Sequence, residues 1–177
     1  LSVNRFDQVT HLYKLFGCER IVCDLKKGFI NLDLNYSIKG YKDLYSIADI
    51  TTNHGTSEHV FNQVTFFEAM HLMTKENGHM LHVLNCQGWA DGGGYGHGFY
   101  LYQPKFVKLL AEANEYELID IQYNPSSVSA DLKKFTPQDY PKDVLPSSWP
   151  VKYPHFSSLL VLLKKVNSAD FVIPTEY

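Results

Sequence analysis

The stretch Ala48-Asp49-Ile50-Thr51-Thr52-Asn53-His54-Gly55-Thr56-Ser57-Glu58-His59-Val60-Phe61-Asn62 decides the fold of this chain. It begins as a strand-like run, stops at a cluster of small and polar residues, and continues into a helical pattern from about Glu58. Ser57 is a candidate helix N-cap, and apolar residues then recur at helical spacing at Val60, Val64, Phe67 and Met70. Ligands of open α/β sheets bind at the carboxyl ends of strands, so this junction is a candidate site.

The composition indicates an ordinary globular protein with a small-molecule partner. The chain has 177 residues, of which 45% are hydrophobic and 20% are charged, and we expect a single domain over residues 1–177. The formal net charge is −3, and no long basic run is present. The sequence therefore predicts no binding to nucleic acid or to an anionic membrane surface.

Cysteine usage points to a reducing compartment. Cys18, Cys23 and Cys86 are odd in number and lack C-x-x-C spacing, so they read as reduced thiols. No stretch approaches the roughly 18 apolar residues of a membrane span. We therefore expect a cytoplasmic protein.

The order of the elements predicts an α/β fold. Apolar patterns predict strands at residues 20–24, 29–33, 44–52, 79–84, 117–123 and 156–166, and helices at residues 5–16, from about 58 to 74, and from 104 onward. Alternation of strand and helix favours a doubly wound, mostly parallel sheet. The last two strands have no helix between them, which predicts an antiparallel hairpin at the sheet edge.

Two segments differ from this pattern. Residues 88–98 form a glycine-rich loop, and residues 124–155 are punctuated by six prolines with interleaved aromatic residues. A long loop of the second kind in a compact domain is usually a lid or a binding segment, or else disordered.

The run Gly55-Thr56-Ser57-Glu58-His59-Val60-Phe61-Asn62 resembles the motif at strand four of class I S-adenosylmethionine-dependent methyltransferases. The antiparallel hairpin and the closing Leu162-Leu163-Lys164-Lys165, followed by Phe171-Val172-Ile173-Pro174, extend the resemblance over nearly the whole chain. It implies a Rossmann-like fold and S-adenosylmethionine as cofactor.

The family's glycine-rich loop after its first strand has no counterpart here. Leu1 to Val3 read as the tail of that strand, and the chain opens on Leu1 rather than Met. We therefore expect an N-terminally truncated sequence in which the first strand and its loop are incomplete.

Two carboxylates are candidates for holding a nucleoside. Asp24 ends the second strand, where a carboxylate would accept hydrogen bonds from ribose hydroxyls, or it caps a turn. Asp33 falls where related enzymes bind the adenine edge, and Leu34 would pack on the ring. A turn-forming Asx motif is the competing interpretation of Asp33.

Asn53, His54 and Gly55 follow the next strand, where the resemblance implies contacts with the methionine part of the cofactor. Gly55 would permit close approach of the backbone to a ligand. An ordinary strand-to-helix turn explains the same residues, and His54 replaces what is often a small residue in the family.

His59 and His97 are the candidate bases for removing a proton from the acceptor. A structural, hydrogen-bonded role is the alternative for each. The aromatic residues Trp89, Tyr95, Phe99 and Trp149 are expected to line the opening with them. The other histidines show no metal-site spacing, so no metal is expected.

The sequence therefore predicts a methyltransferase that acts on a small-molecule acceptor. One alternative is a catalytically inactive methyltransferase-like scaffold or partner-binding domain, favoured by the missing loop. A nicotinamide-dependent oxidoreductase fits Asp24 but not the Gly-Thr-x-Glu-His run. The acceptor and the oligomeric state stay open.

Overall fold

The computed structural model describes residues 10–11, 13–25, 30–86, 98–125, 133–134 and 156–175. It divides into two compact units, Leu1–Asp33 and Leu34–Tyr177, which we describe separately. Most of the proline-rich segment 124–155 and of the loop 88–98 lies outside the described residues.

The first unit contains a short helical stretch and two paired strands. The stretch ends at Gly17, whose φ of 71° suits glycine, and the N–H groups of Gly17 and Cys18 bond back to the carbonyls of Lys14 and Tyr13. Strands β1 (Cys23–Asp24) and β2 (Ile30–Asn31) then pair in parallel. The two strands predicted at residues 20–24 and 29–33 are confirmed, but each is shorter than predicted.

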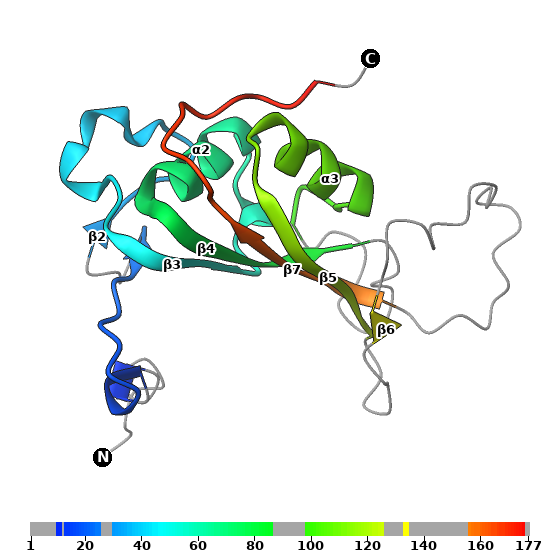
Figure 1. The fold of residues 1–177 in the computed structure, drawn as a ribbon, viewed down its shortest axis with the longest axis horizontal. Helices are drawn as coiled ribbons and strands as arrows, with labels where there is room; N and C mark the ends of the chain where they lie inside the picture. Colours follow the sequence, from blue (N-terminus) through cyan, green and yellow to red (C-terminus); the bar gives the residue numbers. More distant parts are fainter. Residues whose placement is uncertain are drawn as a thin grey trace, which may run out of the picture. The chain divides into compact units, whose positions relative to one another are not determined.

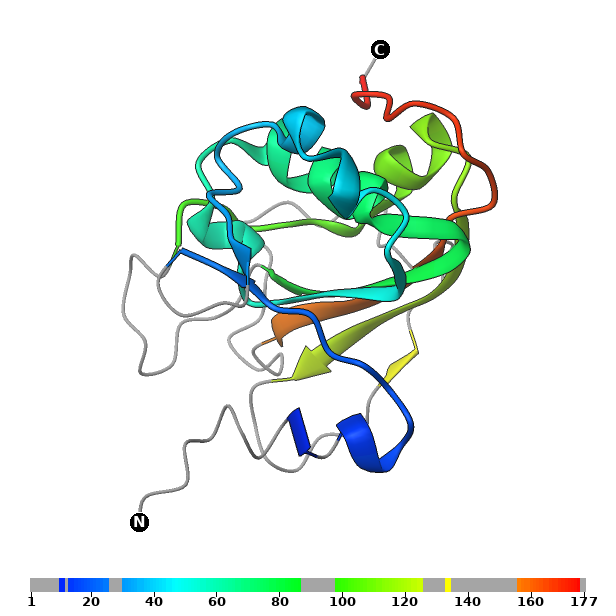
Figure 2. The same ribbon diagram turned by 90° about the vertical axis from the view of Figure 1, so that its left-hand side faces the viewer.

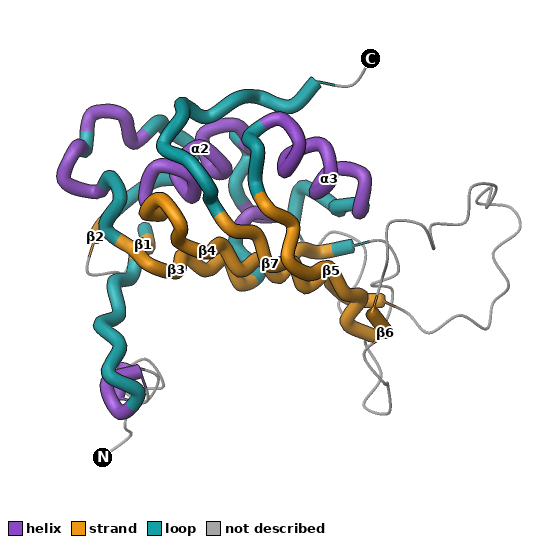
Figure 3. Tube along the Cα trace, viewed as in Figure 1, coloured by secondary structure: helices purple, strands orange, loops and turns teal. Residues whose placement is uncertain are grey.

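The second unit is built on a mixed five-stranded sheet in the order β3-β4-β7-β5-β6 (Figures 1 and 3). Its strands are β3 (Ala48–His54), β4 (Thr74–Asn85), β5 (Glu117–Pro125), β6 (Lys133–Lys134) and β7 (Phe156–Lys164). Strands β3 and β4 are parallel, whereas β7 runs antiparallel to both of its neighbours, β4 and β5. The predicted antiparallel pairing of the last two long strands is confirmed.

The position of β7 differs from the prediction of an edge hairpin. It lies between β4 and β5, and the edge beyond β5 is occupied by the two-residue β6. Its side chains explain the interior position, since Leu159, Val161 and Leu163 are almost completely buried. An edge strand would leave such a row of apolar residues partly exposed.

Both long helices pack on the same face of this sheet (Figures 1 and 2). Helix α2 (Gln63–Met73) and helix α3 (Pro104–Ala113) bury Phe66, Phe67, Val107 and Leu110 against the inward residues of β4 and β7. On the opposite face, Ile50 and Leu81 are 60% and 39% exposed. The described part of this unit therefore has both long helices on one face of a mixed sheet, and the predicted doubly wound parallel arrangement is not confirmed.

No helix in the described part of the chain is long and apolar enough to cross a membrane.

The start of α2 differs from the sequence prediction. Ser57–His59 form a separate 3-10 turn, η3, and α2 begins only at Gln63 with Asn62 as its N-cap. The side chain of Asn35 accepts hydrogen bonds from the N–H groups of Phe61 and Asn62 at 2.9 and 3.1 Å. A distant asparagine thus satisfies backbone donors that an unbroken helix would have used.

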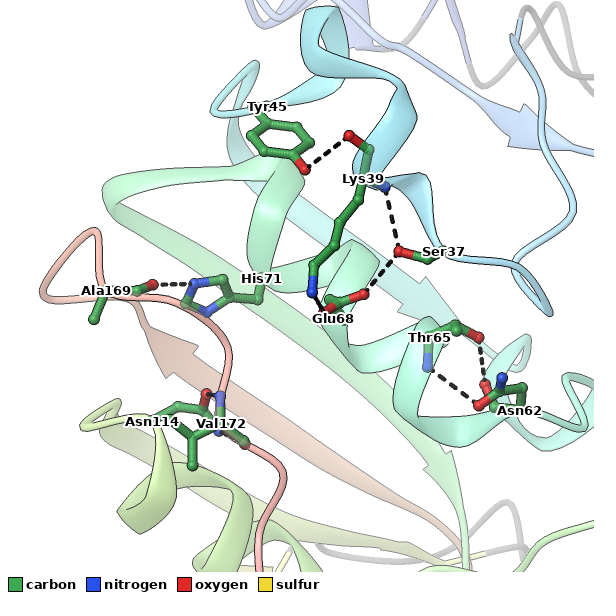
Figure 4. A network of polar contacts seen from close by, with 10 residues as sticks. All are labelled: Ser37, Lys39, Tyr45, Asn62, Thr65, Glu68, His71, Asn114, Ala169 and Val172. Carbon is green, nitrogen blue, oxygen red and sulfur yellow. Dashed lines mark hydrogen bonds and ion pairs between the residues drawn. The ribbon is translucent and has the colours of Figure 1, made fainter.

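The helix layer is tied at its far end to the segment after β7, as Figure 4 shows. His71 bonds through Nε2 to the carbonyl of Ala169 at 2.8 Å. Asn114 bonds to both backbone groups of Val172 at 2.8 and 2.9 Å. The carboxyl-terminal segment is therefore held against both helices.

Helix α2 also holds the 3-10 turn η1 (Ile38–Gly40) through Glu68 (Figure 4). The Glu68 carboxylate accepts from the Ser37 hydroxyl at 3.0 Å and pairs with Lys39 at 2.8 Å.

Replacing Gly78 in β4 should destabilise the sheet. A Cβ at this position would lie 2.9 Å from the Lys75 carbonyl oxygen and 3.0 Å from that of Asp49, and neither backbone group can rotate away. We expect Gly78→Ala to lower the free energy of unfolding by about 1–3 kcal/mol in urea denaturation.

Gly40→Ala is the control, because a Cβ there meets nothing within 4 Å. Equal free energies of unfolding for the two variants would show that the contacts around Gly78 are looser than described.

Candidate functional site

The candidate site is the turn that follows β3. His54 ends the strand, and Gly55 adopts a φ of 65° while its N–H donates to the Val83 carbonyl. Asn53 is only 1% exposed, and its Oδ1 accepts from the N–H groups of Thr56 and Ser57 at 3.2 and 3.1 Å. The buried Asn53 side chain therefore fixes the backbone of the turn from the side of the core.

A buried histidine lies opposite this asparagine. His82 pairs with Asn53 in the register of β3 and β4, and its Nδ1 lies 3.4 Å from Asn53 Nδ2. It is 2% exposed, packs near the Phe67 ring, and its Nε2 has no hydrogen-bond partner among the described residues. Burial lowers the pKa of His82 to about 4, so its imidazole is neutral at pH 7.

Three further polar side chains extend the network under the turn. Asn53 Nδ2 donates to the Ser57 hydroxyl at 2.9 Å, and Gln63 Nε2 donates to the Ser57 carbonyl at 2.8 Å. The Tyr102 hydroxyl donates to Gln63 Oε1 at 2.6 Å. Burial, together with the charge of the nearby Glu58, raises the pKa of Tyr102 to about 12, so this hydroxyl stays a donor.

A second segment, which begins at Gly98, packs onto the same turn. Gly98 has a φ of 75°, and a Cβ there would lie 2.7 Å from Glu58 Cγ and 2.9 Å from the Glu58 carbonyl oxygen. The N–H of Phe99 donates to that carbonyl at 2.6 Å. Glycine is therefore required where the two segments touch.

Several predicted site residues come together at this junction. His54, Gly55 and His59 are exposed around the turn, whereas Asn53 is buried beneath it. Leu34 packs against the core, and its carbonyl accepts from the Thr65 hydroxyl at 2.7 Å. Asn53 and Leu34 thus have structural roles in this unit, and the cofactor and catalytic roles of all five residues stay predictions.

Asp24 and Asp33 belong to the first unit. Asp24 is the exposed last residue of β1, and Asp33 follows β2 by two residues and is half-buried. Because the two strands are parallel, both carboxylates follow carboxyl ends at one edge of the pair. Their convergence with the Asn53–Gly55 turn stays a prediction.

The remaining predicted residues lie outside the described part of the chain. They are the candidate base His97 and the aromatic residues Trp89, Tyr95 and Trp149. Within the described residues, no three histidine, cysteine, aspartate or glutamate side chains form a group that could hold a metal ion.

Sequence reasoning missed His82 and the burial of Glu58. His82 looked like an isolated histidine, because only the pairing of β3 with β4 brings it opposite Asn53. The sequence pattern places Glu58 in the first turn of a helix, but it lies in the separate turn η3 and is 2% exposed, in contact with Gly98. The alternating apolar pattern of β4, with His82 in phase with Met80 and Leu84, was an available signal.

The chain was compared with known families, curated proteins and solved structures. No protein-family model and no curated protein sequence matches it. A solved structure from Bacillus halodurans C-125, described as a "putative methyltransferase", is similar with a TM-score of 0.54 and 16% sequence identity. The alignment covers 90% of this chain and 87% of that one.

This chain has a methyltransferase-like fold. At 16% identity the likeness concerns the fold and not the activity.

The buried His82 should make stability depend on pH. Its pKa falls from the ordinary 6.5 to about 4 on folding, so below pH 6.5 the unfolded chain binds a proton that the folded chain does not. Stability should therefore be lost as the pH falls from 6.5 to about 4, by about 3 kcal/mol for this group. We expect His82→Gln to flatten the pH dependence of the unfolding free energy in that range.

His54→Gln is the matched control, because His54 is exposed at the end of the neighbouring strand. A His82→Gln variant with the same pH dependence as the wild type would contradict the assignment of this effect to His82.

Proposed function

We propose that this chain is an S-adenosylmethionine-dependent methyltransferase that acts on a small-molecule acceptor. The observation that carries the proposal is the sheet itself. The antiparallel β7 pairs with β5 on a sheet whose strands β3, β4 and β5 run the same way, and an antiparallel pair on an otherwise parallel sheet is what the resemblance to methyltransferases implies. The structural likeness to the Bacillus halodurans protein spans 90% of the chain and supports the same proposal.

The chemistry of methyl transfer suits the turn after β3. Transfer from a sulfonium is an in-line displacement, so positioning of the nucleophile and the methyl group supplies much of the catalysis. Gly55 is exposed and lacks a side chain, which leaves room for a ligand against the backbone. The buried bonds from Asn53 and Gln63 hold this backbone in one shape.

Each predicted residue has a role in the proposal. Asp24 would accept the ribose hydroxyls, and Asp33 with Leu34 would bind the adenine. Asn53, His54 and Gly55 would surround the methionine part, where Asn53 acts by fixing the turn. The exposed His59, with His97, would take the proton from an oxygen or nitrogen acceptor.

The proposal is tested by calorimetric titration of the intact protein with S-adenosylhomocysteine and, separately, with NAD. We expect S-adenosylhomocysteine to bind and NAD not to bind. Asp24→Ala should weaken binding about ten- to a hundredfold, the equivalent of about 1.5–3 kcal/mol for a charge-assisted hydrogen bond.

Asp43→Ala is the control, because Asp43 is exposed in the 3-10 turn η2 (Lys42–Leu44). Binding of neither ligand to folded protein would favour the inactive scaffold. Binding of NAD alone would favour the oxidoreductase.

A further inference from the structure

Two exposed aromatic rings stand at the candidate site. Phe61, after the 3-10 turn η3, is 70% exposed, and Phe99, next to Gly98, is 64% exposed. Their ring centroids are 5.7 Å apart and their planes meet at 84°, which is an edge-to-face contact.

The backbone that carries these rings is held firmly. The Phe99 N–H donates to the Glu58 carbonyl at 2.6 Å, and the Tyr100 hydroxyl donates to the Phe61 carbonyl at 2.7 Å. Gly98 packs directly on Glu58. The rings are therefore fixed in place although most of their surface stays in water.

The segments that carry the rings are rich in apolar residues, with the buried Glu58 and the exposed His59 next to them. Val64 and Leu101 are also exposed, at 40% and 60%, beside the two phenylalanines in the sequence. The segments 59–67 and 98–104 contain no lysine, arginine, aspartate or glutamate. A phosphate or carboxylate group would lose its hydration on such a surface without gaining a counter-charge, whereas a cation would be attracted by the ring faces.

The position of the two rings at the carboxyl ends of β3 and β4 favours a role in ligand binding. They follow β3 and β4, two parallel strands, and Tyr102 pairs with Cys86 directly beyond the end of β4. Ligands of open α/β sheets bind at this edge. The aromatic ring of a ligand that binds here could stack on the ring of one phenylalanine and contact the edge of the other.

We propose that Phe61 and Phe99 bind an aromatic ring, and that the methyl acceptor is a small molecule that carries one. The identification of this ligand as an acceptor rests on the proposed function, whereas binding of the ring itself does not. The alternatives are an aliphatic ligand or a second copy of the chain, and the experiment separates them.

The probes are phenol and its saturated counterpart cyclohexanol, titrated into the full chain and followed by ligand-observed NMR. We expect phenol to bind more tightly than cyclohexanol. Phe61→Leu and Phe99→Leu keep an apolar side chain but remove the ring, and each should weaken phenol binding roughly two- to tenfold with little effect on cyclohexanol.

Tyr41→Leu is the control, because Tyr41 is also an exposed aromatic residue, 56% exposed, but lies before η2. Equal binding of the two probes by the wild type, or unchanged phenol binding in both phenylalanine variants, would overturn the proposal. A concentration-dependent dimer that Phe61→Leu abolishes would assign the surface to a second copy and overturn it as well.

The two proposals fail separately. If phenol binds as expected but S-adenosylhomocysteine does not, the aromatic site stands and the methyltransferase proposal falls. If S-adenosylhomocysteine binds but the probes are not discriminated, only the aromatic site falls.

Discussion

The insertion of β7 between β4 and β5 is the constraint on which the second unit depends. Its backbone bonds on both sides to strands that run the opposite way, so β4 and β5 point in the same direction. Leu159, Val161 and Leu163 then form the middle of the surface on which α2 and α3 pack. With β3 added in parallel, the carboxyl ends of β3 and β4 open at one edge, and the candidate site follows from that geometry.

At this edge the hydrogen bonds of Asn53 convert a strand end into a rigid turn. A buried amide is costly unless its donors and acceptor are used, and here they bind the backbone and hydroxyl of η3. The backbone of Thr56 and Ser57 is therefore fixed from the core side, while His54 and Gly55 stay exposed. A preformed wall of this kind is what positioning catalysis requires.

Local patterns in the sequence were enough to predict most elements of the second unit. Periodicity predicted β3, β4, β5, β7 and α3, with Pro104 at the start of α3, because burial on one or both faces leaves a direct record in the sequence. Strand order leaves no such record, and the interior position of β7 was missed. The late start of α2 depends on Asn35, a residue distant in sequence. The prediction of Ser57 as the N-cap was therefore wrong, because it considered only neighbouring residues.

The junction after β3 also reverses the usual distribution of residues. It buries Asn53, Ser57, Glu58 and His82 and exposes Phe61, Phe99 and Leu101, whereas the buried core of the unit lies between the sheet and the helices. Hydrogen bonds offset part of the cost of the buried groups, but nothing in the folding of the described residues requires the exposed rings. Sites where local rules fail while the surrounding fold obeys them are typical of functional surfaces. The polar layer holds the backbone in place, and the rings that it positions face outward, where a ligand can reach them.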